Sequence, residues 1–316
     1  MSTRRDHGQL DETTPFVTLR AGAEVILAGK AMTRIGLVAA RGKVEAEDLV
    51  DDVATWLQEH GCDVIMEDGL DRDLGAQAEA IVVLGGDGLM MRVANHYPDR
   101  PLLGINFGKV GFLALVERRD WKAALMALVE GRFRVQEGAT LSATLVRAGV
   151  QRDQGWSIND VVIRGGVRMV DVEVYVDGHY VNTYPGDGMI IATPHGSTAY
   201  GMAAGGPILT AGVRGFAIVP ISCHSPIRTP LIVGEDALIE LVMADDDEAT
   251  LILDGRPTET LGNADLIVVR RGVHRFRLVS LESTSFFEAV RTKFNFQIRP
   301  DAVPTRRPSR GLDTPA

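Results

Sequence analysis

The segment of this sequence best suited to chemistry is residues 84–88 (LGGDG), which directly follow a short apolar run. The glycines allow a sharp turn and let backbone amides approach a phosphate, and the helix expected next adds a favourable dipole. Asp87 would repel a phosphate unless a metal ion or a substrate hydroxyl lies between them. Arg92, in the first turn of that helix, indicates a nearby anion, since a cation there is otherwise mildly unfavourable. The pattern fits a phosphoryl-transfer site, and it fits an ordinary strand-to-helix turn about equally well.

A second segment with binding character is residues 186–200 (GDGMIIATPHGSTAY), followed by a GGP sequence at 205–207. A strand that runs into a Gly-Ser-Thr turn presents hydroxyls and free amides to a polar ligand, and Tyr200 offers a ring for a flat one. The alternative is a tightly packed glycine corner, but so many small and hydroxyl residues together favour a ligand site. The GxGxxG and GxxxxGK(S/T) nucleotide loops are both absent, so neither of those binding modes is predicted.

Alternating strands and helices are expected to position the first segment. Gly61 stands where a C-cap glycine would end the first helix. Strand-like apolar runs and stretches of helical spacing alternate, which predicts crossover connections and a largely parallel sheet. The expected strands are 34–40, 62–66, 80–84 and 102–106, and the expected helices are 46–57, 89–95 and 121–130.

After about residue 133 the pattern changes to many short strands with few helices, which predicts an antiparallel β domain. The expected strands are 141–147, 158–164, 170–176, 189–193, 217–221, 237–243, 250–253, 265–270 and 276–281, and residues 285–294 return to helical spacing. The predicted organisation is an extension at 1–33, an α/β domain at 34–133 completed by 282–298, a β-rich dinucleotide-binding domain at 134–281, and a disordered tail at 299–316.

Composition narrows the class of protein. The 316 residues are 45% hydrophobic and 24% charged, as in a folded globular chain, and the net charge of −9 argues against nucleic acid or an anionic membrane as the main partner. No apolar run approaches the roughly 18 residues of a membrane span. Cys62 and Cys223 lie far apart without metal-type spacing, which indicates a reducing cytoplasm.

Together the two glycine-rich segments resemble the NAD kinase family in order and separation. Further matches are Asn159-Asp160, which is similar to the family's Asn-Glu pair, residues 104–113 (GINFGKVGFL), and the turn at 254–256 (DGR). The resemblance spans roughly residues 34–294. GGDG alone is shared with lipid kinases and phosphofructokinases, whereas the GSTAY block is typical of NAD kinases. The implied fold is the two-domain fold of NAD kinases and diacylglycerol kinases.

The resemblance implies phosphorylation of the adenosine 2′-hydroxyl of NAD, with ATP as donor and Mg²⁺ or another divalent cation assisting. Two residues before the position of Asp187 the family can have an arginine, which the resemblance links to preference for NAD; Pro185 stands there in this chain, so we expect NADH to be accepted as well. Asp87 would be the catalytic residue, and no protein metal ligand is implied. A homodimer or homotetramer is implied, with part of each site crossing the subunit interface. The implied cofactor-binding residues are Gly85, Gly86, Gly88, Arg92, Phe112, Asn159, Asp160, Asp187, His195, Thr198, Ala199 and Tyr200.

This chain departs from the family pattern at several positions. Leu89 replaces a threonine after GGDG, Asp160 is one methylene shorter than glutamate, and His195 replaces a threonine. Cys223 replaces a proline, and Arg256 replaces a glutamine. Two alternatives therefore stay open: a GGDG-type lipid kinase and a non-catalytic dinucleotide-binding regulator. The sequence also leaves open polyphosphate as donor and the preference between NAD and NADH.

Overall fold

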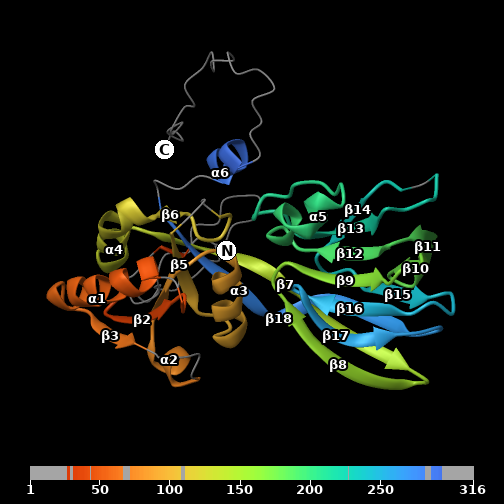
Figure 1. Cartoon of the computed structure of the whole chain (residues 1–316), viewed down its shortest axis with the longest axis horizontal. Coiled ribbons are helices and arrows are strands. Elements are labelled where there is room, and N and C mark those ends of the chain that lie inside the picture. Colours follow the sequence, from red (N-terminus) through yellow and green to blue (C-terminus); the bar gives the residue numbers. More distant parts are fainter. Residues whose placement is uncertain are drawn as a thin grey trace, which may run out of the picture.

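The computed structural model describes residues 27–28, 31–42, 44–66, 72–107, 111–226, 228–281 and 286–293. Two lobes lie side by side, an α/β lobe and a β lobe (Figure 1). The predicted extension at 1–33 is described only at 27–28 and 31–33, and the predicted tail at 299–316 lies outside the described residues.

The α/β lobe is built on parallel strands in the order β5-β4-β2-β3. The centre is β4, where every residue is buried, as expected of a parallel strand covered on both faces. Alternate β4 residues face opposite layers: Ala80, Val82 and Leu84 pack with α1 and α4, whereas Ile81 and Val83 pack with α2 and α3. The elements are β2 (Arg34–Ala39), α1 (Val44–Glu59), β3 (Asp63–Met66), α2 (Arg72–Gln77), β4 (Ala80–Leu84), α3 (Asp87–His96), β5 (Pro101–Asn106), β6 (Val116–Glu117), η1 (Arg118–Asp120) and α4 (Trp121–Val129).

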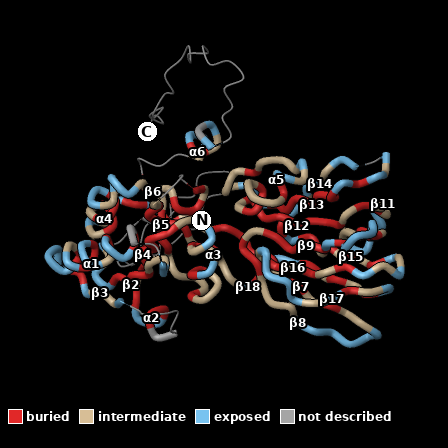
Figure 2. The backbone as a smooth tube through the Cα atoms, viewed as in Figure 1, coloured by how far each residue is buried: buried red, intermediate tan, exposed pale blue. Residues whose placement is uncertain are grey.

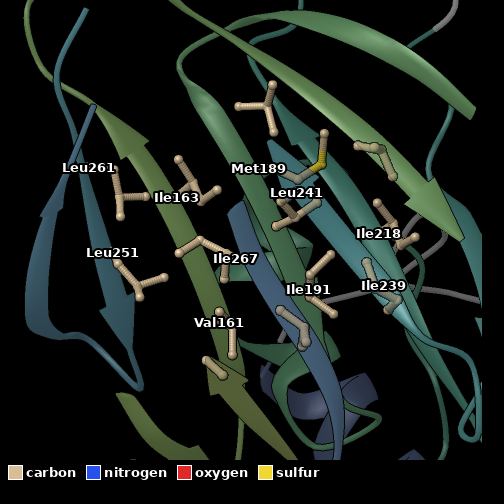
Figure 3. Close-up of a cluster of buried hydrophobic side chains, with 14 of the residues drawn as sticks. Val161, Ile163, Met189, Ile191, Ile218, Ile239, Leu241, Leu251, Leu261 and Ile267 are labelled. Atoms are coloured by element: carbon tan, nitrogen blue, oxygen red, sulfur yellow. The ribbon is translucent and has the colours of Figure 1, made fainter. Parts of the chain in front are cut away.

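In the β lobe, two sheets pack face to face over a core of branched aliphatic side chains (Figure 3). One sheet has the order β14-β13-β12-β9-β16-β17 and is antiparallel throughout. The inner faces of both sheets are buried, whereas the edges and loop tips are exposed (Figure 2). The strands are β7 (Arg134–Arg147), β8 (Val150–Ser157), β9 (Asp160–Gly165), β10 (Val170–Val176), β11 (His179–Gly186), β12 (Gly188–Ala192), β13 (Gly215–Ile221), β14 (Leu231–Gly234), β15 (Ile239–Met243), β16 (Ala249–Leu253), β17 (Arg256–Leu261) and β18 (Leu266–Ser280).

The second sheet of the β lobe continues into the α/β lobe through β7 and β18. The carboxyl end of β18 pairs in parallel with β5, at Arg277 with Pro101 and Leu278 with Leu102. The prediction of separate strands at 265–270 and 276–281 was wrong, because β18 is one strand with a register shift between Arg271 and Arg275. The polar sequence within that bulge interrupts the apolar alternation without ending the strand.

The predicted helices at 46–57, 89–95 and 121–130 are confirmed, although α3 begins at Asp87. The helical spacing at 285–294 corresponds to α6 (Phe286–Lys293). Six strands were not predicted by the pattern, and each pairs with a single neighbour at a sheet edge: β1 (Leu27–Ala28), β6, β8, β11, β14 and β17. Among the described residues, no helix is long and apolar enough to cross a membrane.

Candidate active site

The glycine-rich segment forms the turn between β4 and α3, at the carboxyl edge of the parallel sheet, where open α/β sheets bind ligands. Gly85 donates its N–H to the Ile105 carbonyl at 2.9 Å. A Cβ on buried Gly85 would lie 2.7 Å from the Leu89 side chain, whereas Cβ atoms on Gly86 and Gly88 would meet nothing within 4 Å. The turn therefore leaves Gly86 and Gly88 beside open space, as a ligand-binding loop requires.

The Asp87 carboxylate lies at the first turn of α3 and accepts three backbone N–H groups. Its Oδ2 accepts from Phe112 at 2.8 Å, and its Oδ1 accepts from Leu113 at 3.1 Å and Ala114 at 3.0 Å. A Cβ on Gly111 would come within 1.7 Å of Oδ1, so only glycine permits this approach. The Asp87 side chain is still 30% exposed. The carboxylate thus joins the glycine-rich turn to residues 111–114 and keeps an open side.

The C-terminal helix α6 also reaches this carboxylate. Lys293 Nζ lies 3.7 Å from Asp87 Oδ2 and 4.3 Å from the centre of the Phe112 ring. Phe286 lies on the same face of α6, two turns before Lys293, and its ring centre is 6.1 Å from that of Phe112. Arg92 is exposed on α3. Arg92 follows Asp87 by five residues, which places it about 140° away around the axis of α3, so the two side chains lie on different faces of the helix.

Asn159 brings the β lobe against the same helix. Its Nδ2 lies 3.2 Å from Sδ of Met91, which shares a face of α3 with Asp87 one turn earlier. Its Oδ1 is buried and has no hydrogen-bond partner in the described part of the chain. An unpaired buried amide oxygen is costly and is the kind of group that a ligand hydroxyl would satisfy.

Two carboxyl groups adjoin Asn159: that of Asp160, which is buried, and that of Asp254, which is half-buried. Burial, and then the negative charge of Asp254, raise the pKa of Asp160 to about 7. Burial also raises the pKa of Asp254, while hydrogen bonds from the backbone of Ile158, Asn159 and Asp160 act in the opposite direction. Perturbed carboxyl groups of this kind are typical of functional sites.

The Gly-Ser-Thr turn packs directly on the Asn159 backbone. It forms a short 3-10 helix (Gly196–Thr198) after β12, followed by α5 (Tyr200–Ala203). A Cβ on Gly196 would lie 1.9 Å from the Asn159 carbonyl oxygen, so this contact requires glycine. Thr198 donates its hydroxyl to the His195 carbonyl at 3.0 Å, and Ala199 donates its N–H to the Gly196 carbonyl at 2.9 Å. The turn and Asn159 form one wall of the site.

His195 faces the junction of the lobes. Its ring packs edge-on against Phe276, with 4.9 Å between the ring centres, and a Cβ on Gly138 would lie 2.3 Å from the ring. Both ring nitrogens are buried and have no partner within the described residues. Burial lowers the pKa of His195 to about 4, so the ring is neutral at neutral pH.

Asp187 and Tyr200 lie toward the other end of β9 and β12. Arg164, which pairs with Gly188 in the sheet, hydrogen-bonds the Tyr200 hydroxyl. Asp187 lies between β11 and β12 and donates its N–H to the Ile221 carbonyl at 2.9 Å. Four strand residues, about 13 Å, separate Asp160 from Arg164. Within one chain, the structure therefore brings Asp87, Phe112, Asn159 and Asp160 together and leaves Asp187 apart.

Two open cavities flank these groups. One, of about 350 Å³, lies between α3 and the β lobe and is lined by residues that include Asn95, Trp156 and Arg256. The other, of about 460 Å³, lies beside the Asp187 end and includes Cys223 and His224.

Sequence reasoning missed several contributors, namely Lys293, Thr193 and the Asp254 carboxylate. Asp254 and Thr193 lie within segments that the sequence singled out, but their roles depend on contacts with residues distant in sequence, and Lys293 carried no local signal. Gly111 was noted within a matching segment, but its close approach to Asp87 has no local signal.

A glycine-bounded aspartate at the carboxyl edge of a parallel sheet, opposite an antiparallel β lobe that supplies an amide and a carboxyl group, defines a two-domain kinase fold. Family comparison specifies the class further. Residues 70–133 match the ATP-NAD kinase N-terminal domain, and residues 158–281 match the ATP-NAD kinase C-terminal domain. This chain belongs to the NAD kinase family, which confirms the resemblance found in the sequence.

Similar proteins agree with this assignment. The chain is 56% identical over 283 residues to an NAD kinase of Thermomicrobium roseum, covering 90% of this chain and 98% of the relative. It is 35% identical to an NAD kinase of Syntrophotalea carbinolica, covering 84% and 99%. Its fold is similar to that of yeast NADH kinase complexed with NADH, with a TM-score of 0.79, 18% identity and coverage of 89% and 93%. It is also similar to an Archaeoglobus fulgidus NAD kinase in complex with ATP, with a TM-score of 0.67, 23% identity and coverage of 83% and 98%. The predicted two-domain fold is confirmed.

Proposed function

We propose that this chain transfers the γ-phosphoryl group of ATP to the adenosine 2′-hydroxyl of NAD, giving NADP and ADP. The observation that carries this proposal is the 56% identity to an NAD kinase over nearly the whole length of both chains. Neither the lipid kinase nor the non-catalytic regulator is favoured by the similarities described above. The departures at Leu89, Asp160 and His195 bear on rate and preference rather than on the class of reaction.

Asp87 would act on the attacking hydroxyl. A carboxylate has about four lone-pair positions, and three are taken by the N–H groups of 112–114. Lys293 Nζ at 3.7 Å is beyond hydrogen-bond distance, so one position stays available on the exposed side. The 2′-oxygen would form a bond to the γ-phosphorus while the bond to the ADP oxygen breaks, and the hydroxyl proton would pass to Asp87.

Asn159 and Asp160 would hold the dinucleotide. The buried, unpaired Oδ1 of Asn159 suits a ribose hydroxyl as donor. A protonated Asp160 can donate a hydrogen bond, and an ionised one can accept two, so it suits a diol. Gly85, Gly86 and Gly88 would admit the phosphates, and Arg92 would approach them from the face of α3 that it shares with Gly88 rather than from the face of Asp87. Phe112, His195, Thr198 and Ala199 would border the dinucleotide.

A divalent cation fits this site only together with the donor. Among the described residues, no group of three or more His, Cys, Asp or Glu side chains could hold a metal ion. Mg²⁺ is commonly bound through substrate phosphates together with few protein ligands. The donor's phosphates would supply most of its ligands here, because the one open position of Asp87 is taken by the 2′-hydroxyl. Mg²⁺ would neutralise charge on the transferring phosphate.

We infer that the enzyme is a homodimer or homotetramer and that a second copy completes the site. Support comes from the separation of Asp187 from the Asp87 group along β9 and β12 within one chain. Co-expression of Asp87→Asn and Asp187→Asn chains tests this. Recovery of activity in mixed oligomers, with neither variant active alone, is expected. A monomer in sedimentation analysis, or no recovery in isolated mixed oligomers, would contradict it.

The proposed domains remain 34–133, completed by 282–298, and 134–281. Pairing of β18 with β5 supports a return of the chain to the first domain. A cytoplasmic location is proposed from the substrates alone.

A coupled assay with an NADP-specific dehydrogenase tests the main proposal. The purified chain with NAD, ATP and Mg²⁺ is expected to form NADP, and the Asp87→Asn variant is the matched negative control. Separate arms with polyphosphate and with NADH define the donor and acceptor. Dinucleotide binding without NADP formation in any arm would instead favour a non-catalytic regulator.

A further inference from the structure

The turn between β16 and β17 places one carboxylate against the backbone that precedes β9. Asp254 and Gly255 have φ values of 49° and 74°, as in a two-residue hairpin of the Asp-Gly kind. Asp254 Oδ2 accepts the Ile158 N–H at 2.8 Å. Its Oδ1 accepts the N–H groups of Asn159 at 2.7 Å and Asp160 at 3.3 Å. Three consecutive backbone donors therefore converge on a single half-buried side chain.

The same backbone is held from its other side by Thr193. Its hydroxyl donates to the Ile158 carbonyl at 2.6 Å, and its N–H donates to the Asn159 carbonyl at 2.9 Å. The Asp254 N–H in turn donates to the Asp160 carbonyl at 3.1 Å. All three residues of this segment are thus held through their backbone polar groups, and the Asn159 side chain is left to reach toward α3 and the site.

We propose that Asp254 is the positioning residue of the dinucleotide site: through the N–H groups of 158–160 it sets the orientation of the Asn159 amide and the Asp160 carboxyl, without touching the substrate itself. The inference rests on the proposed function for the identity of the ligand. Asp254 contributes fixed geometry, because a carboxylate that accepts three N–H groups permits one arrangement of the peptide units that carry the two side chains. Its negative charge also acts on Asp160, which is buried beside it.

A substitution at Asp254 has a matched control in the same lobe. Asp265 is likewise a carboxylate that accepts a backbone N–H, from Gly262 at 2.8 Å; it is buried and pairs with Arg147 at 2.6 Å. It lies away from Asn159, next to the start of β18. Asp265→Asn therefore reports the cost of neutralising a buried carboxylate without disturbing the 158–160 segment.

The experiment measures the NAD dissociation constant by calorimetry, together with KM for NAD, KM for ATP and the melting temperature. Asp254→Asn replaces an acceptor by an NH₂ group that faces N–H donors. It is expected to weaken NAD binding about tenfold or more, while KM for ATP changes less than threefold. Asp265→Asn is expected to lower the melting temperature and leave the NAD dissociation constant unchanged. Equal effects of the two variants on NAD binding would overturn the proposal.

A double-mutant cycle separates positioning from general loosening of the fold. If Asp254 acts through Asn159, then Asp254→Asn weakens NAD binding much less in an Asn159→Ala background than in the wild type. The full effect in both backgrounds would overturn the proposal. Should Asp254→Asn fail to fold, Asp254→Glu moves the carboxylate by one methylene while keeping its charge, and wild-type NAD affinity in that variant would overturn it. Absence of NADP formation by the wild type would refute the proposed function alone, because the binding measurements need no turnover.

Discussion

At the scale of single residues, Asp87 has both a structural role and a proposed chemical role. Its carboxylate accepts three N–H groups from residues 112–114, and its open side faces the region where phosphate would approach. Asp160, in contrast, is buried beside a second carboxyl group, and its pKa is raised. Both residues therefore predict measurable effects on activity and on stability.

Asp87→Asn is expected to lower kcat by about 10²-fold or more, because an amide cannot take the hydroxyl proton. It should also lower the melting temperature slightly, since the amide cannot accept all three N–H groups. Steady-state kinetics and calorimetry measure the two effects. Asp99→Asn is the control, because Asp99 accepts the Arg275 N–H at 2.7 Å away from the site. It should lower stability with little change in kcat. Wild-type turnover of Asp87→Asn would remove Asp87 from the mechanism.

The raised pKa of Asp160 predicts a stability that falls as pH rises. The pKa is about 7 in the folded state against 3.8 in the unfolded chain, so between these values the folded state binds more protons. The free energy of unfolding therefore decreases as pH increases from about 4 to about 7 and then levels off. Asp160→Asn removes this dependence and should stabilise the protein at pH 8 by a few kcal/mol, on the order expected for a shift of this size.

Denaturant unfolding at pH 5 and pH 8 measures this effect. The wild type should lose more stability between the two pH values than Asp160→Asn does. Parallel pH profiles of the two proteins would show that Asp160 ionises normally in the folded state.

At the scale of elements, α6 links the end of the described chain to the glycine-rich turn. Phe286 packs against Phe112, Ala289 is buried, and Lys293 approaches Asp87. The spacing of these residues, at i, i+3 and i+7, defines the face of α6 that turns toward the α/β lobe. A short helix thus delivers a cation to the carboxylate that would act on the substrate.

Lys293→Gln is expected to lower kcat by about tenfold, because a cation beside Asp87 would offset charge on the transferring phosphate. Lys293→Arg should restore part of the rate. Arg291→Gln on the same helix is the matched control, since Arg291 is exposed and lies 4.0 Å from Glu288. Steady-state kinetics with ATP as the varied substrate distinguish the variants. Equal kcat values for the two glutamine variants would limit α6 to a packing role.

At the scale of the whole molecule, one sheet runs through both lobes by way of β7 and β18. The lobes therefore share backbone hydrogen bonds in addition to side-chain contacts, and the wall formed by Asn159 is held at a defined position relative to α3. We expect binding preference to depend on the residues that line the far end of the β lobe, around Pro185 and Asp187.

Pro185 predicts weak discrimination between NAD and NADH. In the family, a cation two residues before the position of Asp187 is linked to a preference for NAD, and proline offers neither a charge nor a backbone donor. Pro185 is half-buried, and its carbonyl accepts the His224 N–H at 2.9 Å, beside the cavity that contains His224. Similar kcat/KM values are expected for the two dinucleotides at fixed ATP and Mg²⁺. A preference for NAD of about 100-fold, or about 2.7 kcal/mol, would refute this prediction.

The sequence by itself determined the class of fold, the glycine-rich turn and the segments that form the site. The continuous apolar run of β4 could be predicted because a strand buried on both faces needs apolar residues throughout. The spacing in α1 could be predicted because a helix buried on one face repeats apolar residues every three to four positions. Strands β8, β11, β14 and β17 were not readable, because edge strands bury little and carry no strict apolar alternation. Their pairing partners, rather than their own residues, make them strands.

Only the tertiary structure decided how the site is assembled. Asp87 meets Lys293 across 206 positions of sequence, and Asp254 meets Asn159 across 95. Such contacts depend on where the sheet brings distant segments, and a single lysine or a hairpin aspartate looks the same locally whether or not it reaches a site. The raised pKa of Asp160 likewise follows from burial and from a neighbour that is distant in the chain, because a carboxyl group's proton affinity depends on its surroundings and not on its sequence position.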